Sequence, residues 1–286
     1  MRGISLALMI MVLGLGILFA QAPDMSALIA TLKLAQSGDA EAQWQMAGYY
    51  EQGLGVEPDQ QEAIRWYRQA ATSGHVEAQY KVGAFFSSNT EEAVQWYEKA
   101  ALQGHLEAQI KLGNYYNTTN GHKKNPAEAF KWYSLAARQG HPEALYEVGN
   151  AYYYGEGVAK SHKEAFNHYK KASDGGHADA AISLGDCYFN GEGTQPDYAQ
   201  AFKLYESQAK KNNPHALYSL GFCYESGKGA RMNIIRANAM YQLAAHYCTS
   251  GNKSTFESYA QKTSARLSKV DQEKADKIRD EWLNKQ

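Results

Sequence analysis

The sequence predicts an all-α protein, a right-handed solenoid of helix–turn–helix hairpins. The main observation is that an alanine at the start of an amphipathic segment returns every 36 residues, except for one interval of 30. The second is that a glycine-rich turn and another amphipathic segment follow it in nearly every unit. A fixed period of this size is typical of stacked repeats. The opening alanines are Ala42, Ala78, Ala108, Ala144, Ala180 and Ala216.

The first unit shows the pattern of a single repeat. Ala42, Met46 and Tyr50 share one helix face by their spacing. Gly53 and Gly55 then break the helix, because glycine adopts a positive φ at little cost. A second helix follows and ends before a glycine at the usual C-terminal position. Its apolar face and final glycine are Ala63, Trp66, Tyr67, Ala70, Ala71 and Gly74.

Two positions stay nearly constant in the later units. A small residue five places after each opening alanine predicts that the paired helices approach closely. These small residues are Ala47, Gly83, Gly113, Gly149, Gly185 and Gly221. A tyrosine recurs in every second helix and is expected to pack in the core. These tyrosines are Tyr67, Tyr97, Tyr133, Tyr169, Tyr205 and Tyr241.

Different segments are expected at the two ends of the array. Solenoids need terminal covers for solubility. The spacing from Ser268 to Asp271 matches a helix-capping box, and Ala275, Ile278 and Trp282 share one face of the last helix. The predicted organisation is a signal peptide over 1–20, an N-terminal capping half repeat over 21–41, six repeats over 42–251, and C-terminal capping helices over 252–286.

The repeat resembles the Sel-1-like repeat, a relative of the tetratricopeptide repeat. The resemblance rests on Met46-Ala-Gly-Tyr-Tyr50, Gly53-Leu-Gly-Val56, Glu62-Ala-Ile-Arg-Trp-Tyr67 and Ala70-Ala-Thr-Ser-Gly74. It covers about residues 27 to 286 and returns in every unit. The resemblance implies a protein–protein interaction scaffold, a role that the family fills in secretion, signalling, envelope assembly and quality control. It implies no particular partner, because unrelated functions share a fold.

The first 20 residues differ from the rest. Arg2 precedes an apolar run from Ile4 to Ala20, which is short for a bilayer-spanning helix of roughly 20 residues. The pattern is typical of a secretory signal peptide cleaved near Ala20. We therefore expect a periplasmic or secreted protein that is not inserted in the membrane after cleavage. The alternative is an anchor that is kept.

Charge and motifs point away from several classes of function. The net charge is −1, with both signs interspersed, so we expect no binding of nucleic acid. Metal-protease, paired-cysteine and phosphate-loop motifs are absent from the sequence. Two Ser-x-x-Lys matches, at Ser207 and Ser250, lack the companion motifs of penicillin-interacting enzymes. We therefore expect a monomer with no enzymatic activity and no cofactor or metal.

Histidines and acids recur at fixed positions. His75, His105, His141 and His177 each follow the glycine that ends a second helix, and we expect them to cap helices or join repeats rather than bind metal. An acid precedes most opening alanines, where it favours the helix dipole; the alternative is an acidic ladder in a groove. These acids are Glu41, Glu77, Glu107, Glu143 and Asp179.

Three cysteines leave at least one unpaired. Cys187 and Cys223 hold the same position in adjacent repeats, where the expected distance between stacked helices would strain a disulfide. Cys248 is an alternative partner for Cys223. The remaining alternative is that all three are small buried residues.

A partner is expected to bind the concave side, lined by the first helix of each hairpin. Positions two, six, nine and ten after each opening alanine face this side and vary between repeats. At Trp44, Tyr80 and Tyr218, packing between repeats is an equal alternative. In the run Tyr152–Tyr154, Tyr152 holds the uniform packing position, which leaves the next two tyrosines for the groove. The predicted binding residues are Asn114, Tyr146, Asn150, Tyr153, Tyr154, Asp186 and Phe189.

The function predicted first is an exported, non-catalytic scaffold that binds another protein. The resemblance includes immunity proteins that neutralise phospholipase effectors of type VI secretion in the periplasm, and the size and export signal agree with that role. The alternatives are a secreted factor that acts on host proteins, or an enzyme acting on β-lactams or peptidoglycan. The sequence identifies no individual partner.

Overall fold

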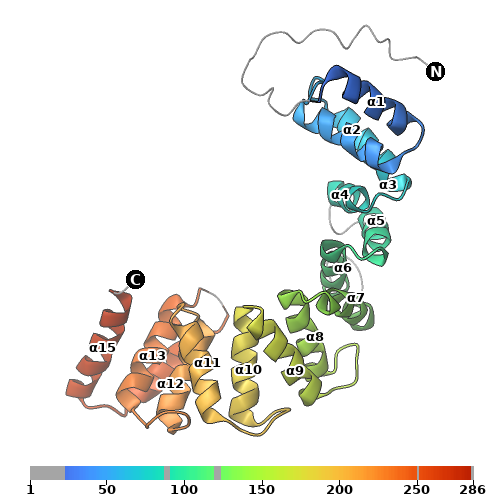
Figure 1. Ribbon diagram of the computed structural model, residues 1–286. Helices are drawn as coiled ribbons and strands as arrows, with labels where there is room; N and C mark the ends of the chain where they lie inside the picture. Colours follow the sequence, from blue (N-terminus) through green and yellow to red (C-terminus); the bar gives the residue numbers. More distant parts are fainter. Residues whose placement is uncertain (1–22, 87–90, 119–123, 250, 285–286) are drawn as a thin grey trace. The chain divides into compact units, whose positions relative to one another are not determined.

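The structure is a computed structural model that describes residues 23–86, 91–118, 124–249 and 251–284. Within these ranges the chain forms fifteen α-helices and no strand (Figure 1). This confirms the predicted all-α solenoid. The helices are α1 (Met25–Gln36), α2 (Ala40–Gln52), α3 (Gln60–Thr72), α4 (Val76–Phe85), α5 (Glu91–Leu102), α6 (Leu106–Asn117), α7 (Pro126–Arg138), α8 (Pro142–Tyr154), α9 (His162–Asp174), α10 (Ala178–Asn190), α11 (Tyr198–Ala209), α12 (Pro214–Ser226), α13 (Ile234–Tyr247), α14 (Lys253–Ser264) and α15 (Lys269–Leu283).

The chain divides into two compact units, Met1–Leu135 and Ala136–Gln286. In the first unit, α2 pairs with α3 and α4 with α5, while α1 covers α2. In the second, α8 pairs with α9, α10 with α11 and α12 with α13, and each hairpin stacks on the next. Helices α14 and α15 both pack against α13 at the end of this unit.

A glycine in the first helix and a tyrosine in the second make every hairpin tight except α2–α3, where Ala47 stands at the position of the glycine. A Cβ placed on Gly149 would lie 2.7 Å from the ring of Tyr169, and one on Gly185 would lie 2.6 Å from the ring of Tyr205. The tyrosine rings therefore occupy the space that a larger residue would need. The close approach predicted from the small residues is present in both units.

A histidine joins consecutive repeats. His177 Nδ1 accepts a hydrogen bond from the amide of Ala180 at 3.1 Å and so caps α10. Its Nε2 lies 2.9 Å from Glu143 Oε2 of the preceding repeat, and its ring stacks on Tyr146 with the centroids 4.5 Å apart. One imidazole thus makes three contacts, and Nδ1 accepts only if Nε2 carries the proton.

The same arrangement occurs twice in the first unit. His75 caps α4 and stacks on Trp44, and His105 caps α6 and stacks on Tyr80. Their Nε2 atoms lie 3.1 and 3.0 Å from Glu41 and Glu77. His141 begins α8 without a side-chain cap bond. The expected capping and joining role is confirmed for the other three histidines, and three of the recurring acids pair with them.

Buried glutamines add a contact that the sequence analysis missed. Gln43, Gln79 and Gln109 follow the opening alanines, and each donates to a carbonyl oxygen near the end of the preceding helix. The distances from Nε2 to oxygen are 3.0–3.1 Å. Each of these carbonyls also accepts a bond from the amide of the glycine that follows the helix, so the glutamine supplies a second donor at the helix end.

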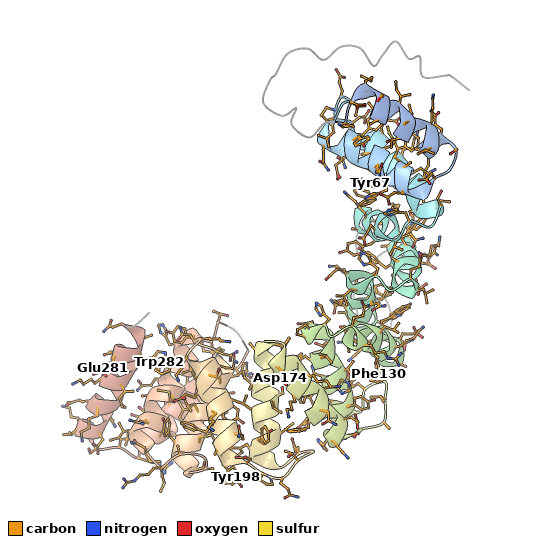
Figure 2. All side chains as sticks on the ribbon, in the orientation of Figure 1. Tyr67, Phe130, Asp174, Tyr198, Glu281 and Trp282 are labelled. Atoms are coloured by element: carbon orange, nitrogen blue, oxygen red, sulfur yellow. The ribbon has the colours of Figure 1, made fainter. Side chains whose placement is uncertain are left out.

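The last helix is fixed at both of its ends. Ser268 Oγ accepts from the amide of Asp271 at 3.2 Å, which makes it the N-cap of α15 as the capping box predicts. Near the other end Trp282, labelled in Figure 2, donates from Nε1 to Asn212 Oδ1 at 3.0 Å. Ala275 is buried in the hydrophobic core against which Trp282 also packs. Helix α15 therefore covers apolar surface of the second unit.

The predicted signal peptide over 1–20 lies outside the described residues. In the part of the chain that the structure describes, no helix has the length and hydropathy needed to span a membrane.

Candidate functional site: the exposed face of the first helices

The predicted binding residues lie on the first helix of their hairpins. Six of the seven are in the second unit, on α8 and α10. Asn114 lies on α6 in the first unit and is described separately. Tyr154 is 67% exposed, and Asp186 is also exposed. Tyr146, Asn150, Tyr153 and Phe189 are half-buried.

Tyrosine hydroxyls of the second helices hold three of these residues in place. Tyr169 donates to Asn150 Oδ1 at 2.9 Å, and Tyr205 donates to Asp186 Oδ1 at 2.6 Å. In the first unit Tyr133 makes the equivalent bond to Asn114 Oδ1 at 2.6 Å. The core tyrosine of each of these hairpins thus reaches through to its exposed face.

Tyr153 is more engaged than the sequence analysis suggested. Its hydroxyl donates to Glu192 Oε2 at 2.8 Å, and Glu192 lies in the loop of the next repeat. Its ring meets the edge of His162 at a centroid distance of 5.0 Å. Tyr154 packs edge-on against Tyr153 at 4.9 Å and keeps most of its surface in solvent. Tyr153 therefore supports Tyr154.

Tyr146 contributes mainly to packing between repeats, through its stack on His177. Trp44 and Tyr80 make the equivalent stacks, and Tyr218 stacks on Phe256 instead. For Trp44, Tyr80 and Tyr218 this is the packing alternative that the sequence analysis left open.

Phe189 continues the aromatic surface along the second unit. Its ring lies 5.3 Å from Tyr198 and 5.6 Å from Phe222 between centroids. Phe222 is 39% exposed at position six of its repeat. Lys228 Nζ lies 5.1 Å from the centre of Phe189 and 4.9 Å from that of Tyr198. We call Tyr153, Tyr154, Phe189 and Phe222 the aromatic strip.

Two carboxylates on this face have raised pKa values. Desolvation is the largest effect on Asp186, and the nearby Glu192 carboxylate raises its pKa further, against a lowering by the Tyr205 hydrogen bond. Asp186 keeps an exposed surface, so surrounding protein rather than full burial causes the shift. Desolvation also raises the pKa of Glu147, which hydrogen-bonds to Asn150. Two carboxyl groups of this face thus lie in partly desolvated surroundings.

The cysteine thiols lie in the core rather than on the exposed face of the first helices. Over the described ranges, no three histidine, cysteine or acidic side chains converge to hold a metal ion. Cys187, Cys223 and Cys248 are buried and form no disulfide, and burial raises the pKa of Cys187 and of Cys223 to about 12. Both thiols are thus protonated at neutral pH.

The repeat pattern decides the family. The Sel1 repeat model matches residues 40–75, 76–105, 106–141, 142–177, 178–213 and 214–246. The chain belongs to the Sel1 repeat family. This confirms the resemblance seen in the sequence, and the matched units reproduce its spacing of 36 and 30 residues.

Solved structures agree with that membership. A protective antigen of uropathogenic Escherichia coli with an SLR fold is 26% identical, with a TM-score of 0.67, over 91% of this chain and 56% of that one. This chain thus spans little more than half of that antigen. A Sel1 repeat protein of Oxalobacter formigenes is 30% identical, with a TM-score of 0.54, over 76% of this chain and 96% of the other.

An immunity protein of Pseudomonas aeruginosa is more distant. It is 22% identical, with a TM-score of 0.35, over 67% of this chain and 77% of that one. At this distance the likeness carries no argument about function. A comparison with curated proteins gave no match.

Proposed function

We propose that this Sel1 repeat scaffold is an exported, non-catalytic protein that binds a partner protein on the exposed face of α8, α10 and α12. The observation that carries the proposal is a contrast between two kinds of position. The glycine–tyrosine contacts repeat in each of these hairpins, whereas the exposed positions hold different residues in each repeat. Variation within a constant frame suits a surface that recognises one partner.

The aromatic strip supplies the chemistry for such binding. Tyrosine and phenylalanine are enriched in protein interfaces, and tyrosine is prominent among hot-spot residues. Tyr154 and Phe222 remain exposed while Tyr153 and Phe189 support them from below. A partner can therefore bury these rings without moving the backbone of the helices.

The partner we propose first is a secreted antibacterial effector of the phospholipase class, which this protein would neutralise in the periplasm. The size and the signal-like sequence of residues 1–20 support it. A second candidate is a secreted factor that contacts host proteins, and the likeness to the E. coli protective antigen favours it. Among the residues that the structure describes, no observation favours the alternative of an enzyme acting on β-lactams.

Site-specific photocrosslinking tests the binding proposal. A photoreactive phenylalanine analogue replaces Tyr154 on α8 in one variant and exposed Lys170 on α9 in the control. Irradiation of intact producing cells, with mass spectrometry of the products, should give a discrete protein adduct from position 154 only. Equal adducts from both positions would contradict the proposal.

Export is tested on the same cells. N-terminal sequencing of the protein from the envelope fraction should begin near Gln21. A product found only in the membrane, with Met1 or Arg2 retained, would show an anchor instead.

A further inference from the structure

The first and second helices of the second unit differ in charge. Helices α8, α10 and α12 carry five acidic residues and neither lysine nor arginine. These acids are Glu143, Glu147, Asp179, Asp186 and Glu225. Helices α9, α11 and α13 carry five basic residues and three acidic ones. The acidic charge thus lies on the side of the first helices and the basic charge on the side of the second helices.

The first unit lacks this segregation. Its helices α4 and α6 each include a lysine, Lys81 and Lys111. Lys81 Nζ lies 2.6 Å from Glu51 Oε2, which neutralises that carboxylate within the unit. In the second unit Glu225 pairs with Arg266 and Glu143 with His177. The acids of its first helices that form no salt bridge among the described residues are Glu147, Asp179 and Asp186.

Two carboxylates beside the aromatic strip are each bonded through a single oxygen. Asp186 Oδ1 accepts from Tyr205, and Glu192 Oε2 accepts from Tyr153. Within the described residues the other oxygen of each carboxylate has no hydrogen bond, and neither group forms a salt bridge. Tyrosines therefore orient both carboxylates while leaving acceptor positions open.

Two rings of the strip already have a lysine over them, since Lys160 Nζ lies 5.9 Å from the centre of Tyr153 and Lys228 contacts Phe189. Lys228 lies within 5.1 Å of the centres of Phe189 and Tyr198, the latter labelled in Figure 2. A cation over an aromatic face is attracted by the quadrupole of the ring. In the described part of the chain, no lysine or arginine stacks on the exposed rings of Tyr154 or Phe222. These rings remain open to a cation from a partner.

We propose that the aromatic strip, with Asp186 and Glu192, binds an arginine-bearing basic segment of the partner protein. This inference rests on the proposed function and adds the chemistry of the partner. An arginine guanidinium suits the surface because its plane stacks on rings while its N–H groups donate to carboxylates. A positive charge would also offset the desolvation of Asp186 and the nearby charge of Glu192, which together raise the pKa of Asp186.

The test uses a short synthetic peptide of alternating arginine and glycine as its probe. The matched control peptide has citrulline for arginine, which keeps the shape and removes the charge. Fluorescence anisotropy with the purified protein measures both affinities. We expect the arginine peptide to bind at least about tenfold more tightly than the citrulline peptide and to weaken as salt increases.

Variants of the protein locate the binding. Asp186→Asn with Glu192→Gln should weaken the arginine peptide about tenfold, since both partners of the cation lose their charge. The control pair, Asp174→Asn with Glu206→Gln, makes the same change in net charge on α9 and α11 and should leave the affinity unchanged. Hydrogen exchange should show protection on α8, α10 and α12 when peptide is bound.

Three results would overturn the inference. They are equal weakening by both pairs of substitutions, protection confined to α9 and α11, and failure of the arginine peptide to bind. In each case the scaffold proposal stands or falls separately, because the Tyr154 crosslink does not depend on the charge of the partner.

Discussion

The hydroxyl of Tyr205 donates to Asp186 Oδ1 at 2.6 Å, whereas Tyr169, at the equivalent position of the preceding repeat, donates to Asn150. Asp186 thus occupies a position where Asn114 and Asn150 accept the same bond without a charge. An asparagine would satisfy the tyrosine at no cost in ionisation. The carboxylate is therefore explained better by binding than by folding.

Replacing Asp186 by asparagine should remove a dependence of stability on pH. The pKa of Asp186 is raised above its ordinary value of 3.8, so between the two values the folded state holds more protons than the unfolded state. Stability contributed by this group is full below pH 3.8 and is lost as pH rises through the folded pKa. Asp186→Asn should therefore not lower the free energy of unfolding at pH 7. It should raise it by at most about 1 kcal/mol, because the group is exposed.

The matched change is Asn150→Asp, which should introduce the same dependence in the preceding repeat. Urea unfolding of both variants at several pH values between 4 and 7 measures the effect. A less stable Asp186→Asn protein at pH 7 would show that the carboxylate supports the fold.

The tight hairpin contact predicts opposite effects for two glycine substitutions. A Cβ at Gly83 would lie 2.8 Å from the Tyr97 ring, whereas one at Gly48 meets no atom within 4 Å. Gly83→Ala should lower the free energy of unfolding by about 1–3 kcal/mol through overpacking. Gly48→Ala should raise it by about 0.5–1 kcal/mol, because alanine favours a helix interior.

Thermal unfolding of the two proteins under one set of conditions is the measurement. Stabilisation by Gly83→Ala would mean that the ring of Tyr97 moves aside freely and that glycine is not required there.

The contacts of His177 can be separated by two substitutions. Asn213 caps α12 at the equivalent position of the next repeat, so His177→Asn should keep the cap and lose the contacts to Glu143 and Tyr146. His177→Ala should lose all three. We expect the alanine variant to be less stable than the asparagine variant by about 1 kcal/mol, the usual value of a cap.

Chemical unfolding gives the difference between the two variants, and hydrogen exchange at the start of α10 reports the cap itself. Equal stability together with equal exchange would show that His177 does not cap the helix in solution.

The thiols of Cys187 and Cys223 should be unreactive in the folded protein. Burial raises both pKa values to about 12, and the thiolate is the reactive form. At pH 8 a thiol-specific chromogenic reagent should modify them only after denaturant is added, with the denatured protein as the control. Rapid modification of both without denaturant would contradict the buried environment.

The sequence was sufficient to predict the repeats, the paired helices and the packing of glycine against tyrosine, because these follow from period and residue size. It also predicted the role of His75, His105 and His177, though not the missing cap bond of His141. It did not reveal that Tyr153 bonds to Glu192, since the two are 39 residues apart and Glu192 lies in a loop. Periodicity says nothing about such a contact between a helix and a loop.

The candidate site could be predicted only in part, because periodicity does not report contacts between repeats. The exposed positions follow from helical phase, but the sequence alone did not distinguish Tyr146, which stacks on a histidine, from Tyr154, which faces solvent. Phe222 occupies an exposed position that the sequence analysis did not select. Its contact with Phe189 depends on how two neighbouring repeats stack.

The most direct test of the central claim uses the partner protein captured by the Tyr154 crosslink. Its affinity is measured for two variants of this protein, the double variant Tyr154→Ala/Phe222→Ala and the single variant Tyr152→Ala. Tyr152 is half-buried against His168 and supports the core. We predict that the double variant binds at least about thirtyfold more weakly, as expected for a hot-spot aromatic, with a nearly unchanged melting temperature. Tyr152→Ala should melt earlier and still bind while folded. Normal binding by a folded double variant would contradict the assignment of this face.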